Sequence, residues 1–208
     1  MMVLLTLAQA ALASESIYDR DLVRGFLSLK GDFRSTKSDG VRLINSVTGK
    51  SYVKEFLDGH VEIGGEYNKL RTWIDVDFMP ITPTRGYTEW FTYGITWMWG
   101  YKLLSQNSRG NIIPSIGPGF ALLNIRDQTR DIISSLGPAL NLELELRLQS
   151  RQFSVGLYGG YKIERHYNWD DANKSWPFKD ANTDKIFAGM KFSWTMLNNF
   201  QKREREME

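Results

Sequence analysis

The sequence contains no cysteine among its 208 residues. This absence excludes disulfide bonds, thiolate metal sites, a cysteine nucleophile and a lipidated N-terminal cysteine. The chain also has little net charge, because 26 basic side chains oppose 24 acidic ones, so it offers no electrostatic footprint for nucleic acid. A mean hydropathy of -0.36, with charges throughout the body of the chain, excludes a bundle of transmembrane helices. An aromatic content of 13% argues against a disordered chain, and the length suits one domain.

The first 13 residues have the pattern of a secretory signal peptide. A short apolar run ends in Ala11-Leu12-Ala13, which suits signal peptidase and makes Ser14 the first mature residue. No Lys or Arg precedes the run, and a start codon assigned too late would explain that difference. The alternative is a short buried helix or strand. Export agrees with the absence of cysteine, since a stray thiol is a liability in an oxidising compartment.

Alternation of apolar and polar residues is the main structural signal. In 140–149, leucine occupies every even position and a polar residue every odd position, which predicts a strand with one apolar and one polar face. Seven other segments alternate less strictly. The sequence therefore predicts eight strands, at 22–34, 60–68, 71–79, 87–102, 111–124, 140–149, 152–166 and 185–196.

The connections between these segments alternate in length, which indicates an up-and-down sheet with its long loops at one end. The longer connections are about 35–59, 80–86, about 125–135 and about 167–184. Short turns at one end and long loops at the other are typical of outer-membrane barrels. A hairpin within 41–56 is too short to span a membrane, and ten strands is the alternative count. A proline has no backbone N–H to donate to the neighbouring strand, so prolines in a sheet are expected at bulges or strand ends. This expectation applies to Pro114, Pro118 and Pro138.

Residue size indicates which face of the barrel is enclosed, whereas alternation alone fits both a membrane barrel and a soluble lipocalin-like barrel. Most strand glycines share the polar face, and the apolar face is crowded with aromatic residues and leucines. The lumen of an eight-stranded barrel barely holds side chains, so the bulky rings are expected outside it. The predicted lipid-facing set is Leu140, Leu142, Leu144, Leu146, Leu148, Trp97, Trp99, Phe192 and Trp194.

The polar face is expected to fill the lumen with ion pairs, because buried charges must be paired. This prediction describes a plugged barrel, and a gated ion path is the alternative. The predicted lumen network is Arg24, Lys30, Asp32, Glu62, Glu66, Arg71, Asp75, Asp77, Glu143, Glu145, Arg147, Lys162, Glu164 and Lys191.

The pattern over about residues 20–196 resembles the small eight-stranded outer-membrane barrels of the OmpA, OmpX and opacity type. Gly189-Met190-Lys191-Phe192-Ser193-Trp194 is similar to the last-strand signal of such proteins, although Phe187 stands where that signal prefers a polar residue. The resemblance implies an all-β, antiparallel, up-and-down transmembrane barrel over 14–200. It also implies residence in the outer membrane of a diderm bacterium, contact with its lipid and lipopolysaccharide, and recognition of 185–196 by the barrel assembly machinery. The charged residues 201–208 would then form a periplasmic tail.

The sequence holds few candidates for chemistry, and we predict no catalytic residue, metal or cofactor. His166 in Glu164-Arg165-His166-Tyr167-Asn168 faintly resembles the His-x-Ser motif of the lipid A deacylases, but Asn168 replaces the serine. A lipid-modifying enzyme is therefore the first alternative, and a soluble carrier of an apolar ligand is the second. The remaining candidates are a metal pair at His60 and Glu62, an acid–base pair at Asp75 and Asp77, and a loop cation site at Asp170, Asp171 and Asp180. The expected role is a non-enzymatic one at the cell envelope, through the external loops.

Overall fold

The computed structural model describes residues 24–38, 55–78, 89–104, 108–126, 132–150, 152–170 and 180–196. The predicted signal peptide 1–13 and the charged tail 201–208 lie outside these ranges, as does the possible hairpin at 41–56 except for its last two residues. Within the described ranges, no helix is long and apolar enough to cross a membrane.

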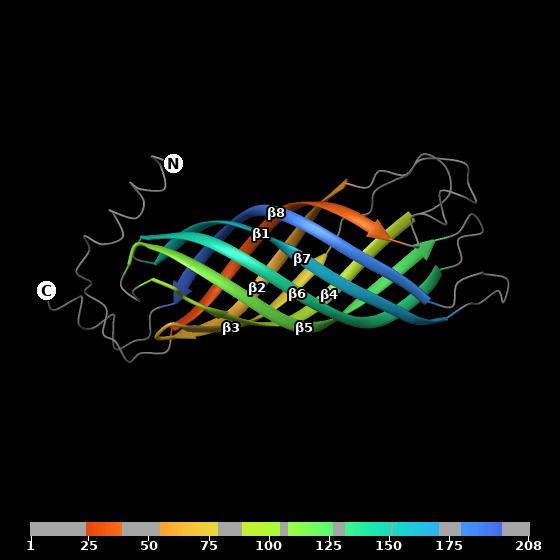
Figure 1. Cartoon of the computed structure of the whole chain (residues 1–208), viewed down its shortest axis with the longest axis horizontal. Helices are drawn as coiled ribbons and strands as arrows, with labels where there is room; N and C mark the ends of the chain where they lie inside the picture. Colours follow the sequence, from red (N-terminus) through yellow and green to blue (C-terminus); the bar gives the residue numbers. More distant parts are fainter. Residues whose placement is uncertain are drawn as a thin grey trace, which may run out of the picture.

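Eight antiparallel strands form one closed barrel, and each strand pairs with the next in the chain until β8 closes against β1 (Figure 1). This confirms the predicted all-β, up-and-down, eight-stranded fold of the transmembrane type. The strands are β1 (Arg24–Ser38), β2 (Glu55–Tyr67), β3 (Leu70–Phe78), β4 (Glu89–Tyr101), β5 (Gly110–Arg126), β6 (Ile132–Ser150), β7 (Phe153–Asp170) and β8 (Asp180–Met196).

The strands cross the barrel at a steep angle, which follows from the register of their pairs. The pairing starts at Arg24 of β1, passes through Glu66, Arg71 and the later strands, and returns to β1 at Arg34. The closed sheet is therefore staggered by ten residues. Combined with standard strand spacings, this stagger gives a tilt of roughly 40° from the barrel axis. Such a tilt is normal for membrane barrels.

The two ends of the barrel differ. At the turn end lie the β2–β3, β4–β5 and β6–β7 connections, together with the start of β1 and the end of β8. The β2–β3 connection has only two residues, and Asn68 adopts a φ of 54°, which Asn tolerates better than most side chains. The loop end holds the connections 39–54, 79–88, 127–131 and 171–179, which lie outside the described residues.

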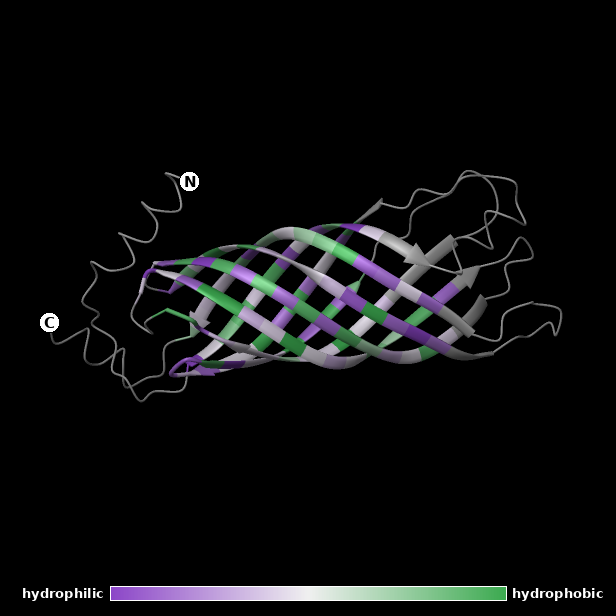
Figure 2. Ribbon diagram, viewed as in Figure 1, coloured by the Kyte–Doolittle hydropathy of each residue, from purple (hydrophilic) through white to green (hydrophobic). Residues whose placement is uncertain are grey.

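The exposed side chains of the strands are mainly apolar and the buried ones mainly polar. The same alternation appears as changing colours along the strands in Figure 2. In β8 the exposed apolar series runs from Ile186 to Met196. Ten residue steps at the barrel's tilt correspond to an apolar belt of roughly 26 Å along the axis. A belt of this height matches the hydrocarbon thickness that outer-membrane barrels cross. Most bulky apolar side chains therefore lie outside, whereas the soluble-carrier alternative requires the apolar face to line the interior.

The three prolines lie within strands, so the expectation that they mark strand ends was wrong. Pro114 and Pro118 are in β5 and Pro138 is in β6, all with exposed rings. A proline has no backbone N–H to donate to the neighbouring strand. Accordingly, the β4–β5 register has no pair at Pro118, and the β6–β7 register has no pair at Pro138. A register shift follows nearby, between Ser134 and Leu136. The barrel therefore tolerates Pro118 and Pro138 by giving up two consecutive ladder pairs at each, and Pro114 lies just past the last pair of β5 with β4.

Candidate functional site

The barrel interior carries nearly all the chemistry of the described residues. Nine basic and nine acidic side chains are buried there, each no more than 6% exposed, together with both histidines of the chain. These charges balance, which suits an enclosed space where an unpaired charge would be costly. They form three groups along the axis. The turn-end cluster is Arg24, Glu66, Arg71, Lys102, Glu145 and Arg147. The central cluster is Lys30, Glu62, Asp75, Glu143 and Lys191. The loop-end cluster is Asp32, Arg34, Asp58, His60, Asp77, Lys162, Glu164, His166 and Lys185.

All 14 side chains assigned to the lumen from the sequence are buried in the interior. Strand parity missed four charged ones: Arg34, Asp58, Lys102 and Lys185. Each lies at or beyond the edge of a segment as the sequence delimits it; β1, β2 and β8 are longer than the alternation indicates, and Lys102 follows the last residue of β4. The predicted lumen network has two more acidic than basic side chains. When these four residues are included, the numbers of buried acidic and basic side chains are equal. Extending each alternating segment by a few residues would have found them.

Ion pairs, together with the contacts of the His60 ring with Asp75 and Asp32, link the three clusters without a break. Successive nitrogen–oxygen distances along this ladder are between 2.6 and 3.3 Å. In order from the turn end, its members are Lys102, Glu66, Arg147, Glu145, Lys191, Glu62, Lys30, Asp75, His60, Asp32, Arg34, Asp77, Lys162, Glu164 and Lys185. The interior is thus one connected polar network, and its members come from six of the eight strands and the β4–β5 turn.

Two groups of acids with metal-like spacing are each held by a cation of β1. Glu62, Asp75 and Glu143 surround the ammonium of Lys30, at distances of 3.1, 3.1 and 2.7 Å. Because an ammonium has three N–H donors, one can point at each carboxylate. These three acids therefore already have their counter-ion.

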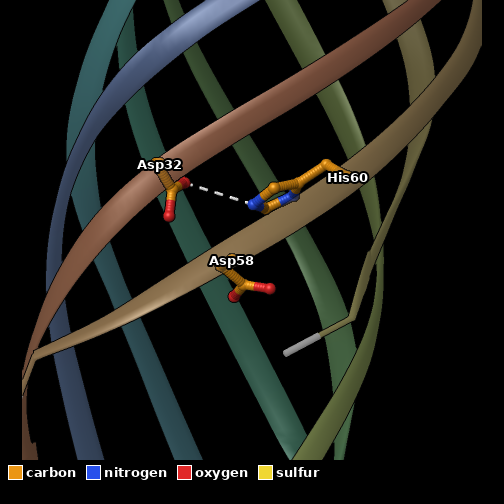
Figure 3. Close-up of side chains that lie close together, drawn as sticks. All are labelled: Asp32, Asp58 and His60. Carbon is orange, nitrogen blue, oxygen red and sulfur yellow. Dashed lines mark hydrogen bonds and ion pairs between the residues drawn. The ribbon is translucent and has the colours of Figure 1, made fainter. Parts of the chain in front are cut away.

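The second group is Asp32, Asp58 and His60, which face one another across β1 and β2 (Figure 3). The Arg34 guanidinium lies among them, with Nε 3.1 Å from Asp32 and 2.8 Å from Asp58. Its Nη2 lies 2.7 Å from Nε2 of His60. A metal ion at this position would have to displace Arg34, so the group is an arginine-centred ion cluster.

Aromatic rings also occupy the lumen, which corrects the expectation that they are too bulky for it. Phe26, Trp73 and Met98 form a small apolar cluster inside the barrel. The Arg71 guanidinium lies 3.7 Å from the centroid of the Phe26 ring, a cation–π contact that covers the charge with a ring. Nearer the loop end, Tyr158 and Phe187 pack at 5.9 Å between centroids. The glycines of the same face make room for these rings.

Lys102 lies just past the end of β4 and closes the turn end of the ladder. Its ammonium is 3.0 Å from Glu66. Burial lowers the pKa of Lys102, and the attraction of Glu66 opposes that change. The ladder thus ends near the turn end at a lysine that has little contact with water.

The sequence-derived candidates for chemistry are placed as follows. His166 faces the lumen, fully buried, with Nε2 3.5 Å from Glu164. His60 and Glu62 point inward but belong to different ion clusters, and Asp75 and Asp77 each accept from cations of the ladder. Asp171 and the side chains of Asp170 and Asp180 lie outside the described residues. None of the described candidates faces the lipid.

The predicted lipid-facing residues all lie on the outer surface, from Leu140 at 36% exposed to Trp97 at 57%. Trp97 and Trp99 stack at 5.2 Å between centroids near the turn end, and Trp97 Nε1 donates to Thr72 Oγ1. Rings that combine an apolar body with a polar atom favour the edge of a bilayer.

Several solved structures with the same architecture are outer-membrane or surface proteins. Neisserial surface protein A has 15% identity and a TM-score of 0.51, covering 80% of this chain and 95% of that one. The fold is that of a small outer-membrane β-barrel. Ail, the attachment invasion locus protein of Yersinia pestis, crystallised with a heparin analogue, has 10% identity and a TM-score of 0.50, covering 83% and 99%. A major outer membrane protein of Thermus thermophilus has 10% identity and a TM-score of 0.50, covering 84% and 99%. No family model and no curated protein matches the sequence.

Proposed function

We propose that this protein is an integral outer-membrane barrel with a sealed polar lumen and a non-enzymatic role at the cell surface. One observation carries the proposal: the outer surface of the described barrel is an apolar belt, and its enclosed side holds nine cations and nine anions, most of them joined in one connected network. A soluble protein would not place Leu144 and its neighbours in water while enclosing its charges. In hydrocarbon the same arrangement is favourable, because the closed barrel has no free edge and most of its backbone groups pair with the next strand.

The proposed orientation places the turn end in the periplasm and the loop end outside the cell, as short turns and long loops do in such barrels. Lipid and lipopolysaccharide would then surround the belt, and the loops would meet a surface partner. Residues 201–208 would lie in the periplasm. We further propose that 185–196 carries the assembly signal, since β8 pairs with β1 and its docking completes the closed barrel.

The non-enzymatic assignment rests on where the only histidine candidate for lipid chemistry lies. A side chain that cleaves lipid must reach the outer surface. His166 instead points into the lumen, where it is buried beside Glu164. The sealed-lumen assignment rests on the charged side chains, whose ion pairs fill the axis from Lys102 to Lys185.

Single cysteines test location and orientation, since the natural chain has none. Lys50→Cys places a thiol in the 39–54 connection, and Lys69→Cys places one in the β2–β3 turn. A membrane-impermeant maleimide should label the first variant in intact cells and the second only after the outer membrane is permeabilised. The unheated protein should also run faster than the boiled protein on a denaturing gel, as a closed barrel does. Recovery in the soluble fraction, or the reverse labelling pattern, would refute the proposal.

Two further measurements test whether the lumen is sealed and whether the protein is non-enzymatic. Purified protein in planar bilayers should carry no steady ion current if the ladder seals the lumen, and a steady current would favour an ion path. The lipid A of cells that overproduce the protein should be unchanged. A deacylated product that disappears in a His166→Asn variant would instead establish the enzyme.

A further inference from the structure

One nitrogen of His60 is in contact with two groups that require opposite protonation states. Nε2 lies 2.7 Å from Arg34 Nη2 and 3.2 Å from Asp32 Oδ2 (Figure 3 shows the contact with Asp32). A guanidinium nitrogen only donates, so the shorter contact requires a bare Nε2 that accepts. A carboxylate only accepts, so the longer contact requires a proton on the same Nε2. The two hydrogen bonds exclude each other.

The second ring nitrogen, Nδ1, identifies the protonation state of His60 that agrees with the 2.7 Å contact between Nε2 and Arg34. Nδ1 of His60 lies 2.9 Å from Asp75 Oδ1, and against a carboxylate it must carry a proton. With Nδ1 protonated and Nε2 accepting from Arg34, the ring is neutral. Asp32 Oδ2 is meanwhile satisfied by the hydroxyl of Tyr158, which donates over 2.9 Å.

We propose that His60 is a proton-operated switch that exchanges Arg34 for Asp32 as the partner of its Nε2. When Nε2 takes up a proton, its N–H turns the 2.7 Å contact with Arg34 into a clash of two donors and two positive charges. The same N–H suits Asp32, 3.2 Å away. Arg34 leaves the ring and keeps its pairs with Asp58 and Asp77, at 2.8 and 3.2 Å.

The charges around His60 favour uptake of one proton. The loop-end cluster has four carboxylates against three permanent cations, so a single proton on one histidine balances it. His60 contacts Asp32 and Arg34 of β1 and Asp75 of β3. The charged and titratable groups that contact these three in turn are Lys30 of β1, Asp58 of β2, Asp77 of β3 and Tyr158 of β7. Glu62 of β2, Glu143 of β6 and Lys162 of β7 lie one contact further along the network. The two positive groups in its immediate contact network, Lys30 and Arg34, oppose the proton, and Asp32 and Asp75 attract it.

The exchange would alter the ion ladder at one step. In the neutral state the His60 ring links Asp75 to Arg34, and in the protonated state it links Asp75 to Asp32. Arg34 also lies 5.6 Å from the Phe187 ring, so its movement changes the packing of an aromatic pair inside the loop end. The switch therefore couples the protonation of one buried ring to the arrangement of the side chains at the loop end.

The chain has only two histidines, which makes a direct test possible. In a His166→Asn variant of the full chain, nitrogen-15-labelled and folded in lipid nanodiscs, every imidazole signal belongs to His60. At neutral pH we expect the Nδ1–H tautomer. On acidification the ring should gain its second proton, and the Arg34 guanidinium signals should shift with the same midpoint.

The matched variant is His60→Gln, in which the Arg34 signals should stay constant over the same pH range. An Asp32→Asn variant, which leaves no carboxylate to receive the Nε2 proton, should move the His60 midpoint to lower pH. Three results would overturn the proposal: an Nε2–H tautomer at neutral pH, a ring that never gains the second proton while the barrel is folded, or a titrating ring with unchanged Arg34 signals.

Discussion

Lys30 of β1 and Glu143 of β6 form a 2.7 Å ion pair although 113 residues and two intervening strands separate them. The pair crosses the lumen, so it ties distant parts of the closed sheet together. Lys30 reaches two more carboxylates, those of Glu62 and Asp75. A single ammonium therefore contacts acids on three strands, and we expect the stability of the central cluster to depend on it.

Lys30→Met should destabilise the barrel by about 3–5 kcal/mol, because it leaves three buried carboxylates without their shared cation. Urea unfolding from lipid vesicles, followed by tryptophan fluorescence, measures the change. Lys69→Met is the control, since Lys69 lies in the β2–β3 turn beside the ring of Tyr101. If the two variants unfold at the same urea concentration, the central cluster does not stabilise the fold as proposed.

Leu144→Arg should impair insertion by roughly 2–4 kcal/mol, the cost of a charge near the bilayer midplane. Leu144 is 49% exposed and lies in the middle of the outward series Leu140 to Leu148. Leu144→Met, which keeps the side chain apolar, is the matched variant and should insert normally. The measurement is the fraction of protein that reaches the heat-modifiable form in cell membranes. Equal fractions for the two variants would mean that this face does not contact hydrocarbon.

Much of the fold could be predicted because a strand repeats every two residues. The strict alternation of 140–149 identifies β6, and parity alone puts Glu143 and Glu145 inside. Strand ends were less certain, so Asp58 and Lys185 were missed where the alternation fades. The contact of Lys30 with Glu143 was beyond prediction, since it depends on the stagger with which β8 closes on β1. Rings such as Trp73 and Phe187 fit inside only because glycines on neighbouring strands leave space.

Trp97 and Thr72 should show a coupling of about 1 kcal/mol in a double-mutant cycle, since the indole N–H donates to the hydroxyl over 2.8 Å on the apolar surface. The cycle consists of Trp97→Phe, Thr72→Val and the double variant, with each unfolding free energy measured in the same vesicles. Strictly additive losses would show that the hydrogen bond contributes nothing in the bilayer.

Gly189→Ala should cost about 1–3 kcal/mol through overpacking inside the barrel. A Cβ at this position would collide with the carbonyl oxygen of Gly31 and lie 2.6 Å from the Cβ of Asp32. Backbone on the adjoining strand cannot move aside as the end of a flexible side chain can. The variant should therefore fold with the same heat-modifiable mobility but unfold at a lower urea concentration.

Gly31→Ala is the matched control, because Gly31 lies on the neighbouring strand but faces outward. Its nearest contact to an added Cβ is the carbonyl oxygen of Asp58, at an ordinary 3.8 Å. The change should stay within about 0.5 kcal/mol of the natural protein, as it does at most uncrowded surface positions. Comparison of the two variants isolates the effect of limited space, since the same methyl group is added at neighbouring positions on opposite faces of the sheet. If Gly31→Ala were the more damaging of the two, the enclosed face would be the one that we place against lipid.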